Sequence, residues 1–328
     1  MPQELANDEE AASREAGVTA HSPFVWIGFT VLVAALLVVD LFVLNRRSHV
    51  LSVKEASAWS AGLVGLAAIF GGFLWWREGA QHALEYFTGY LIELSLSVDN
   101  LFVFILIFQF FGVPALAQPK VLKWGILGAI VMRAIMIGIG ALLLARFHWI
   151  IYVFGGILVI TGIRMLRSDG TEIEPEQNPL VRLARRVLPI TPGYDGDRFT
   201  CSTVTHRRMF TPLILVVLVV EWSDLVFAID SIPAIFAITK DPFIVYSSNV
   251  FAILGLRALF FVLAGALDKF QYLKVGVALI LVFIGFKMAL SGFFSVSTPV
   301  ALGGIVVILA ISVVASLLKT RRDAPGTG

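Results

Sequence analysis

The chain has 328 residues, of which 58% are hydrophobic and only 15% are charged, with a formal net charge of +2 and a mean hydropathy of +0.88. A soluble protein of this length needs more polar surface to cover its core, so the composition indicates an integral membrane protein. The sequence lacks the short segments of alternating hydrophobicity that mark a transmembrane β-barrel. The single cysteine, Cys201, excludes an intramolecular disulfide and a multi-cysteine metal site.

The N-terminal residues 1–22 are acidic and lack the basic stretch and apolar core of a signal peptide, so we expect an external, disordered tail. Beyond them, apolar blocks recur at a length close to the ~20 helical residues that cross about 30 Å of hydrocarbon. These predicted spans are 23–44, 57–76, 86–111, 124–145, 149–166, 210–236, 247–267, 272–291 and 299–318. The sequence therefore predicts an all-α polytopic membrane protein with about nine transmembrane helices.

The distribution of Lys and Arg between the loops predicts the orientation of these spans. With nine helices, the loops on the side of the N-terminus hold five of the 25 basic residues, and the loops on the other side hold eighteen. The remaining two, Arg133 and Arg257, lie inside spans. Because basic loops stay in the cytoplasm, we expect the N-terminus outside and the C-terminus in the cytoplasm. The basic segment 167–209 is then a cytoplasmic loop, expected as a solvated linker whose arginines can also touch anionic headgroups.

Two segments of three helices each resemble one another. Arg133 aligns with Arg257 at an offset of 124 residues, and Gly162 aligns with Gly285 at an offset of 123. Because the repeated unit has an odd number of spans, the second copy enters the membrane from the opposite face, which gives the inverted repeat typical of secondary transporters. The predicted parts are an external tail (1–22), two N-terminal helices (23–85), a first three-helix bundle (86–166), a cytoplasmic basic loop (167–209), a second three-helix bundle (210–291), and a last helix with a cytoplasmic tail (292–328).

Five carboxylates interrupt the apolar pattern of two spans that occupy equivalent places in the repeat. One acid at the bilayer centre costs roughly 3 kcal/mol, and the two intramembrane arginines can neutralise only two of the five. Protonated acids or plain helix-joining ion pairs are the alternative to a bound cation. Carboxylate, amide and hydroxyl oxygens together favour a hard divalent cation. The candidate metal ligands are Glu93, Asp99, Asn100, Glu221, Asp224, Asp230 and Ser231, with Arg133 and Arg257 as charge-balancing residues.

Helical phase places two of these acids, Asp99 and Asp230, off the helix faces that the other predicted ligands share. Asp230 lies off the helix face that Glu221 and Asp224 share. Pro233 has no N–H to donate, and its ring clashes with the carbonyl one turn before it. We therefore expect the helix to break at 229–232, which would let Asp230 turn inward and free backbone carbonyls as ligands.

The segments "FTGYLIELSLSVDNLFVF", "TPLILVVLVVEWSDLVFAIDSIPAIFAITKDPF" and "SSNVFAILGLRALFF" resemble the TerC/Alx family of integral membrane proteins. The resemblance runs from about residue 30 to residue 291 and carries the family's acidic positions onto the seven candidate ligands. It implies a bacterial inner-membrane protein linked to manganese efflux and tellurium resistance and grouped with the LysE-type exporters. Asn249 in "SNVFA" could add a carbonyl oxygen or lie where a helix begins.

These features together predict a divalent metal exporter that moves Mn²⁺, with Ca²⁺ and Mg²⁺ as alternatives, by alternating access. No ATP-binding motif occurs in the sequence, so we expect protons as the coupling ion. The expected partners are the cation, protons, the lipid bilayer, and membrane proteins or further copies of the chain, without nucleic acid and without enzymatic activity. A partner in membrane-protein biogenesis or metallation, or a tellurium-resistance component without transport activity, stays open as an alternative.

Overall fold

Long helices make up nearly all of the described chain. The computed structural model describes residues 21–39, 53–147, 149–167, 179–202, 208–264, 272–291 and 296–323. Its elements are α2 (Pro23–Val38), α3 (Val53–Glu78), α4 (Ala80–Phe110), α5 (Gln118–Arg146), α6 (Ile150–Arg167), α7 (Pro179–Val187), β1 (Thr200–Ser202), β2 (Arg208–Phe210), α8 (Leu213–Phe236), α9 (Pro242–Ala264), α10 (Leu273–Ala289) and α11 (Thr298–Asp323). The described part of each predicted apolar block falls on one of these helices, while 40–44 and 265–267 lie outside the described residues.

Six of the described helices are long and apolar enough to cross a membrane, namely α3, α4, α5, α6, α9 and the first part of α11. Of the others, α2 has 16 residues and α10 has 17, near the lower limit of ~17 residues for a span. The helix α8 has 24 residues but includes three carboxylates. The chain is therefore an all-α protein with several membrane-spanning helices, while the count of nine stays a prediction.

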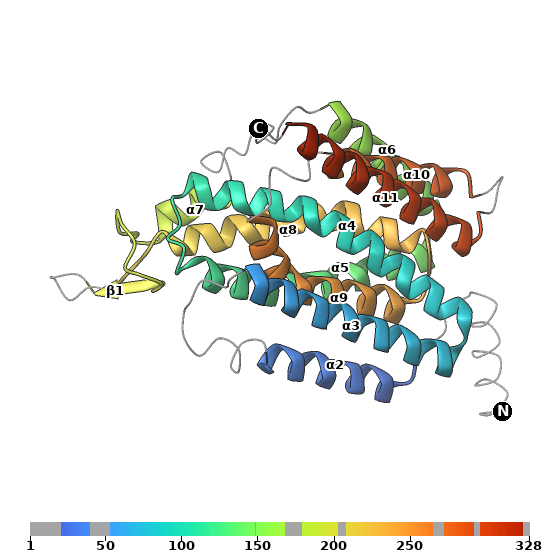
Figure 1. Ribbon diagram of the computed structural model, residues 1–328. Helices are drawn as coiled ribbons and strands as arrows, with labels where there is room; N and C mark the ends of the chain where they lie inside the picture. The colour runs from blue at the N-terminus through green and yellow to red at the C-terminus, as the bar shows by residue number, and fades with distance from the viewer. Residues whose placement is uncertain are drawn as a thin grey trace, which may run out of the picture.

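The centre of the bundle is formed by α4 and α9. In their apolar stretches 75% and 83% of the residues are buried, against 22% in α3 and 17% in α11. Figure 1 shows α2 and α3 on one side of the bundle and α6, α10 and α11 on the opposite side. The helix α4 packs on α9, and α5 packs on α8. Polar side chains on the inner faces of these four helices are thus shielded from both lipid and water.

Glycines let α6 and α10 pack backbone against backbone. A Cβ atom at Gly155 would lie 2.9 Å from the carbonyl oxygen of Gly285, and a Cβ atom at Gly285 would lie 2.8 Å from the carbonyl oxygen of Gly155. Further along, a Cβ atom at Gly162 would lie 2.7 Å from the carbonyl oxygen of Ala278. The two helices therefore run antiparallel, and small residues at these positions permit the close approach.

The basic segment between α6 and α8 contains more structure than a solvated linker. Its described part holds α7, whose Val181 and Ala184 are buried, and the antiparallel hairpin of β1 and β2, in which Cys201 pairs with Met209. Figure 1 shows both at one end of the bundle. The Tyr194 hydroxyl donates a hydrogen bond of 2.6 Å to the carbonyl oxygen at the end of α4. These contacts attach the segment to the helices.

The predicted break in α8 is wrong. The helix is regular from Leu213 to Phe236, with Pro233 inside it. Proline removes a single backbone hydrogen bond, and the residues around it, Ile232 and Ala234, are buried against neighbouring helices. Tertiary packing holds the backbone in helical geometry on both sides of the missing bond, as is common for prolines in membrane helices.

The first described residue anchors the N-terminal segment to the turn between α8 and α9. His21 Nε2 lies 2.8 Å from Asp241 Oδ2, and its Nδ1 lies 3.5 Å from Glu78 Oε1. Burial alone would lower the pKa of His21, but the hydrogen bond and charge of Asp241, with the charge of Glu78, raise it above the ordinary value despite Arg77. Nearly all of the predicted external tail lies outside the described residues.

We expect the folded chain to lose stability as the pH rises above about 6.5, the ordinary pKa of histidine. A group whose pKa is raised by folding stabilises fully below its unfolded pKa, and this stabilisation is lost as the pH rises through the folded pKa. Melting temperatures in detergent should therefore differ between wild type and His21→Gln at pH 6 and converge at higher pH. An equal pH dependence of the melting temperature in both proteins would contradict the stabilising contact of His21 with Asp241.

Candidate cation site

Four central helices bring polar side chains to one buried place. The helix α4 provides Glu93, α5 provides Arg133, α8 provides Asp224 and Ser231, and α9 provides Asn249. None of the five side chains belongs to a residue more than 2% exposed. We call these five residues the central cluster. Its charges lie away from water and from lipid headgroups, where they are stable only with close partners.

Arg133 occupies the middle of the central cluster. Its Nη2 and Nε donate to the two carboxylate oxygens of Asp224 at 3.0 and 3.3 Å. Its Nη1 donates to Glu93 Oε1, to Asn249 Oδ1 at 3.0 Å and to Ser231 Oγ at 3.3 Å. A bidentate arginine–carboxylate pair fixes both separation and plane, so α4 and α8 are held together through the guanidinium of α5.

Asn249 closes the network on the other side of Glu93. Its Nδ2 donates to Glu93 Oε2 at 3.0 Å, while its Oδ1 accepts from Arg133. Every carboxylate oxygen of Glu93 and Asp224 therefore accepts a hydrogen bond. With both carboxylates ionised, the cluster has two negative charges and one positive charge. The surplus is one buried negative charge.

The oxygens of the central cluster are those that hard divalent cations prefer, namely carboxylate, amide and hydroxyl oxygens. Among the described residues, no group of three or more His, Cys, Asp and Glu side chains is arranged to hold a metal ion. The central cluster holds two carboxylates, Glu93 and Asp224, and the guanidinium of Arg133 lies between them, where a bound cation would lie. A cavity of about 10 Å³ beside Asp224 has room for roughly one water molecule. Cation binding thus requires Arg133 to release its carboxylates.

Comparison with known proteins places the chain in a family. The model of the family described as "Integral membrane protein TerC family" matches residues 78–324. The chain belongs to this family. A Myxococcus xanthus relative, named "Uncharacterized membrane protein STKORF319", is 53% identical over 310 residues, covering 93% of this chain and 97% of its own. A relative in Escherichia coli (strain K12), named "Putative membrane-bound redox modulator Alx", is 46% identical over 315 residues, covering 93% and 98%. No solved structure matches.

The TerC match differs in extent from the resemblance seen in the sequence motifs. The family model reaches residue 324 and so includes α11, which the motif resemblance did not reach. It begins at residue 78, at the end of α3, so α2 and nearly all of α3 precede it. All five members of the central cluster lie within the TerC match.

In this TerC-family chain, Glu221 lies outside the central cluster although it is only one helical turn from Asp224. A Cβ atom at Gly128 of α5 would lie 2.0 to 2.3 Å from the carboxylate atoms of Glu221. This carboxylate lines a groove of about 590 Å³ between α5 and α8, together with the exposed Val131 and Ile135. Glu221 is therefore on the outer side of α8, and Gly128 leaves the space that its carboxylate occupies.

Two further predicted ligands lie on α4. Asn100 is 2% exposed, and its Nδ2 has no hydrogen-bond partner among the described residues, as is also the case for Ser97 Oγ. The side chain of Asp99 lies outside the described residues, so its place in the site stays a prediction.

The second predicted charge-balancing residue, Arg257, is buried on α9. In the predicted repeat, α9 corresponds to α5, which provides Arg133.

The structure does not bring Asp230 to the central cluster. Its Oδ1 accepts a hydrogen bond of 2.9 Å from the Thr161 hydroxyl, so the carboxylate faces α6. The next residue, Ser231, faces Arg133 instead. Both placements follow from the regular course of α8, which keeps neighbouring residues on different sides of the helix.

Sequence reasoning left the role of Asn249 open and overlooked Gly128. A signal for Asn249 exists, because it ends a run of three polar residues, Ser247 to Asn249, inside an otherwise apolar helix, and all three are fully buried. Gly128 has no comparable signal. Its importance appears only when α8 places a carboxylate against it.

Proposed function

We propose that this TerC-family protein exports a divalent cation, Mn²⁺ with Ca²⁺ and Mg²⁺ as alternatives, by alternating access in exchange for protons. The observation that carries the proposal is the central cluster, in which oxygens from α4, α8 and α9 surround a single positive charge. A structural ion pair needs one carboxylate for each arginine, whereas Glu93 and Asp224 share Arg133. Surplus buried carboxylates in a membrane protein are typical of ion pathways.

Arg133 acts in this proposal as an internal counter-ion. In the cargo-free state it neutralises part of the charge of Glu93 and Asp224. A divalent cation competes for the same oxygens with two positive charges instead of one. When the cation leaves, the guanidinium and protons take its place, because metal binding to carboxylates is linked to their deprotonation. The buried carboxylates are then never left without a positive partner.

Signs of internal symmetry support alternating access. The packing of α4 on α9 has a counterpart in the packing of α5 on α8. The offset of 123 residues maps Gly155 onto Ala278 and Gly162 onto Gly285. The contact between Gly155 and Gly285 therefore maps onto the contact between Gly162 and Ala278, which also exists. Such reciprocity is what a two-fold axis between α6 and α10 produces, and it favours the inverted repeat.

We also infer a location in the bacterial inner membrane with the N-terminus outside and the C-terminus in the cytoplasm. The unequal distribution of Lys and Arg supports this orientation. It places α7 and the β1–β2 hairpin on the cytoplasmic side and the contact of His21 with Asp241 on the outer side.

The name of the Alx relatives points to redox modulation as another activity. In this chain Cys201, in β1, is the single cysteine. A dithiol–disulfide couple within one chain is therefore excluded. We place a redox role, and a role in membrane-protein biogenesis or metallation without transport, behind cation export because neither makes use of the central cluster.

We expect Asp224→Asn and Glu93→Gln each to reduce Mn²⁺ export by about tenfold or more, because loss of one partner in a buried charge network costs about 2–5 kcal/mol. Asp99→Asn should also reduce export if Asp99 is the ligand that the sequence predicts. The measurement is manganese content, by mass spectrometry, of cells that lack their own exporters and produce each variant. Immunoblots of membrane fractions check that the amounts are equal.

The matched control is Asp195→Asn, which removes a carboxylate that lies in the cytoplasmic segment 3.7 Å from Arg198. Cells with this variant should clear manganese like wild type. Wild-type clearance by Asp224→Asn cells would overturn the shared-site mechanism, and the partner-protein hypothesis would take its place.

A further inference from the structure

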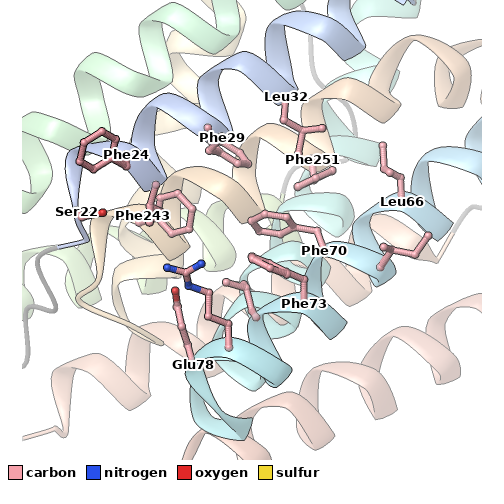
Figure 2. A pocket seen from close by; sticks show the side chains of 15 residues that line it. Ser22, Phe24, Phe29, Leu32, Leu66, Phe70, Phe73, Glu78, Phe243 and Phe251 are labelled. Atoms are coloured by element: carbon pink, nitrogen blue, oxygen red, sulfur yellow. The ribbon is translucent and has the colours of Figure 1, made fainter.

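An apolar groove of about 550 Å³ lies between α2 and α3, away from the central cluster. Figure 2 shows the aromatic rings that line it, among them Phe29 of α2 and Phe70 of α3. The floor is formed by Phe243 of α9, which is 2% exposed. At the rim, Phe24 and Ile69 are 84% and 71% exposed. Within the part of the chain that the structure describes, the groove is thus open at this rim toward the surroundings of the bundle.

One end of the groove is polar. Arg77 and Glu78, at the end of α3, and Ser22, before α2, line it. Figure 2 shows Glu78 at this end of the groove. Glu78 Oε1 faces His21 Nδ1 at 3.5 Å, whereas Glu78 Oε2 is buried and has no hydrogen-bond partner among the described residues. A buried carboxylate oxygen without a donor is unfavourable, so a ligand that donates hydrogen bonds at this end is favoured when the partly exposed Glu78 carboxylate turns toward it.

The dimensions of the groove match one leaflet of a bilayer. From Leu66 to Arg77 the lining follows α3 for about 16 Å, and half of a hydrocarbon core of ~30 Å is about 15 Å. Trp75 and Trp76, in the last turn of α3, are 63% and 82% exposed. Exposed tryptophans gather at the membrane–water interface, so the polar end lies at the level of the headgroups and the apolar part within the hydrocarbon.

We propose that this groove binds one acyl chain of a phospholipid whose headgroup has a primary ammonium, the phosphatidylethanolamine class. The ammonium pairs with the carboxylate of Glu78, and the phosphate lies beside the guanidinium of Arg77, since both residues line the polar end. The neighbouring positive and negative side chains complement a zwitterionic headgroup, which a choline lipid cannot match because its quaternary ammonium has no N–H. A lipid in this position joins α2, which contacts α9, to the end of α3.

The experiment is native mass spectrometry of the full chain released from nanodiscs that contain equal amounts of phosphatidylethanolamine, phosphatidylcholine and phosphatidylglycerol. The wild type should retain one ethanolamine lipid at least about fivefold more often than either of the others. Glu78→Gln should abolish this preference while lipid is still bound. Gly28→Leu should reduce the retention of all three lipids, since the glycine lines the groove and a Cβ atom there meets no other atom within 4 Å.

Gly72→Leu is the matched control, because Gly72 lies on α3 with open space around it and does not line the groove. This variant should retain lipid like wild type. Equal retention of the three lipids by the wild type would overturn the headgroup assignment. If no lipid were retained, the lipid proposal would be overturned and the groove would be vacant. If the chain instead formed a dimer that Gly28→Leu prevents, a second copy would be the occupant of the groove.

Discussion

Replacing Arg133 by methionine is expected to lower the free energy of unfolding by about 3 to 5 kcal/mol, because it leaves buried carboxylates without their positive partner. The guanidinium is fully buried and donates to Glu93, Asp224, Ser231 and Asn249. Methionine fills a similar volume, so the loss reports charge and hydrogen bonding rather than a cavity. Denaturant unfolding in detergent micelles, followed by helical circular dichroism, measures the effect.

Two further variants test the geometry of the arginine contact and the balance of charge in the central cluster. Arg133→Lys keeps the charge but loses the bidentate fork, so its unfolding free energy should fall between those of wild type and Arg133→Met. The triple variant Arg133→Met, Glu93→Gln, Asp224→Asn removes all three charges and should regain most of the lost stability without regaining export. Wild-type stability in Arg133→Met would show that the central cluster is not an ionised network.

The second large effect is expected where α6 meets α10. Gly285→Ala should destabilise the protein by about 1–3 kcal/mol, as overpacking does. The new Cβ atom would lie 2.8 Å from the carbonyl oxygen of Gly155 and 2.9 Å from the amide nitrogen of Val159. Both are backbone atoms, so no flexible side chain can yield, and the helices must separate. Thermal unfolding in the same micelles measures the change.

The neighbouring Gly156 provides the control for this prediction. A Cβ atom at Gly156 meets no other atom within 4 Å, and alanine favours the helix over glycine by up to about 1 kcal/mol. Gly156→Ala should therefore be neutral or stabilising. If Gly285→Ala and Gly156→Ala had the same effect, the backbone contact between α6 and α10 would not be a close one in the folded protein.

Hydropathy predicts the helices well because the membrane demands that every backbone polar group be bonded within its own segment. Each predicted span from 23–44 to 299–318 accordingly contains a helix. The structure within 167–209 was not predicted, since a nine-residue helix and three-residue strands have no length or periodicity that stands out in a polar sequence. These elements are held in place by tertiary contacts, such as the hydrogen bond of Tyr194 to the end of α4.

Helical phase within one helix predicts which side chains of the candidate site share a face. It does not predict which side chains from other helices they contact. At 3.6 residues per turn, Ser231 lies within about 20° of Asp224 around α8, whereas Asp230 lies about 120° away. A continuous helix therefore sends Ser231 to Arg133 and Asp230 to Thr161. The predicted break in α8 would have let Asp230 turn toward Arg133 as well. Because the helix is continuous, Asp230 stays on the side of α6. Which carboxylates Arg133 binds depends on how four helices meet, and no spacing within one helix encodes that.

The charge of the central cluster has an electrical consequence for the proposed exporter. With both carboxylates ionised and no cargo it sums to −1, and a divalent cation turns it to +1, so the membrane potential acts in opposite directions on the empty and loaded forms. Each elementary charge moved through 100 mV corresponds to about 2.3 kcal/mol. With the cytoplasm negative, the outward step of the loaded form and the return of the empty form both oppose the field. Two protons on the carboxylates change the charge of the returning form from −1 to +1, so the field favours its inward step. One divalent cation leaves for two protons that enter, and the whole cycle is electrically neutral.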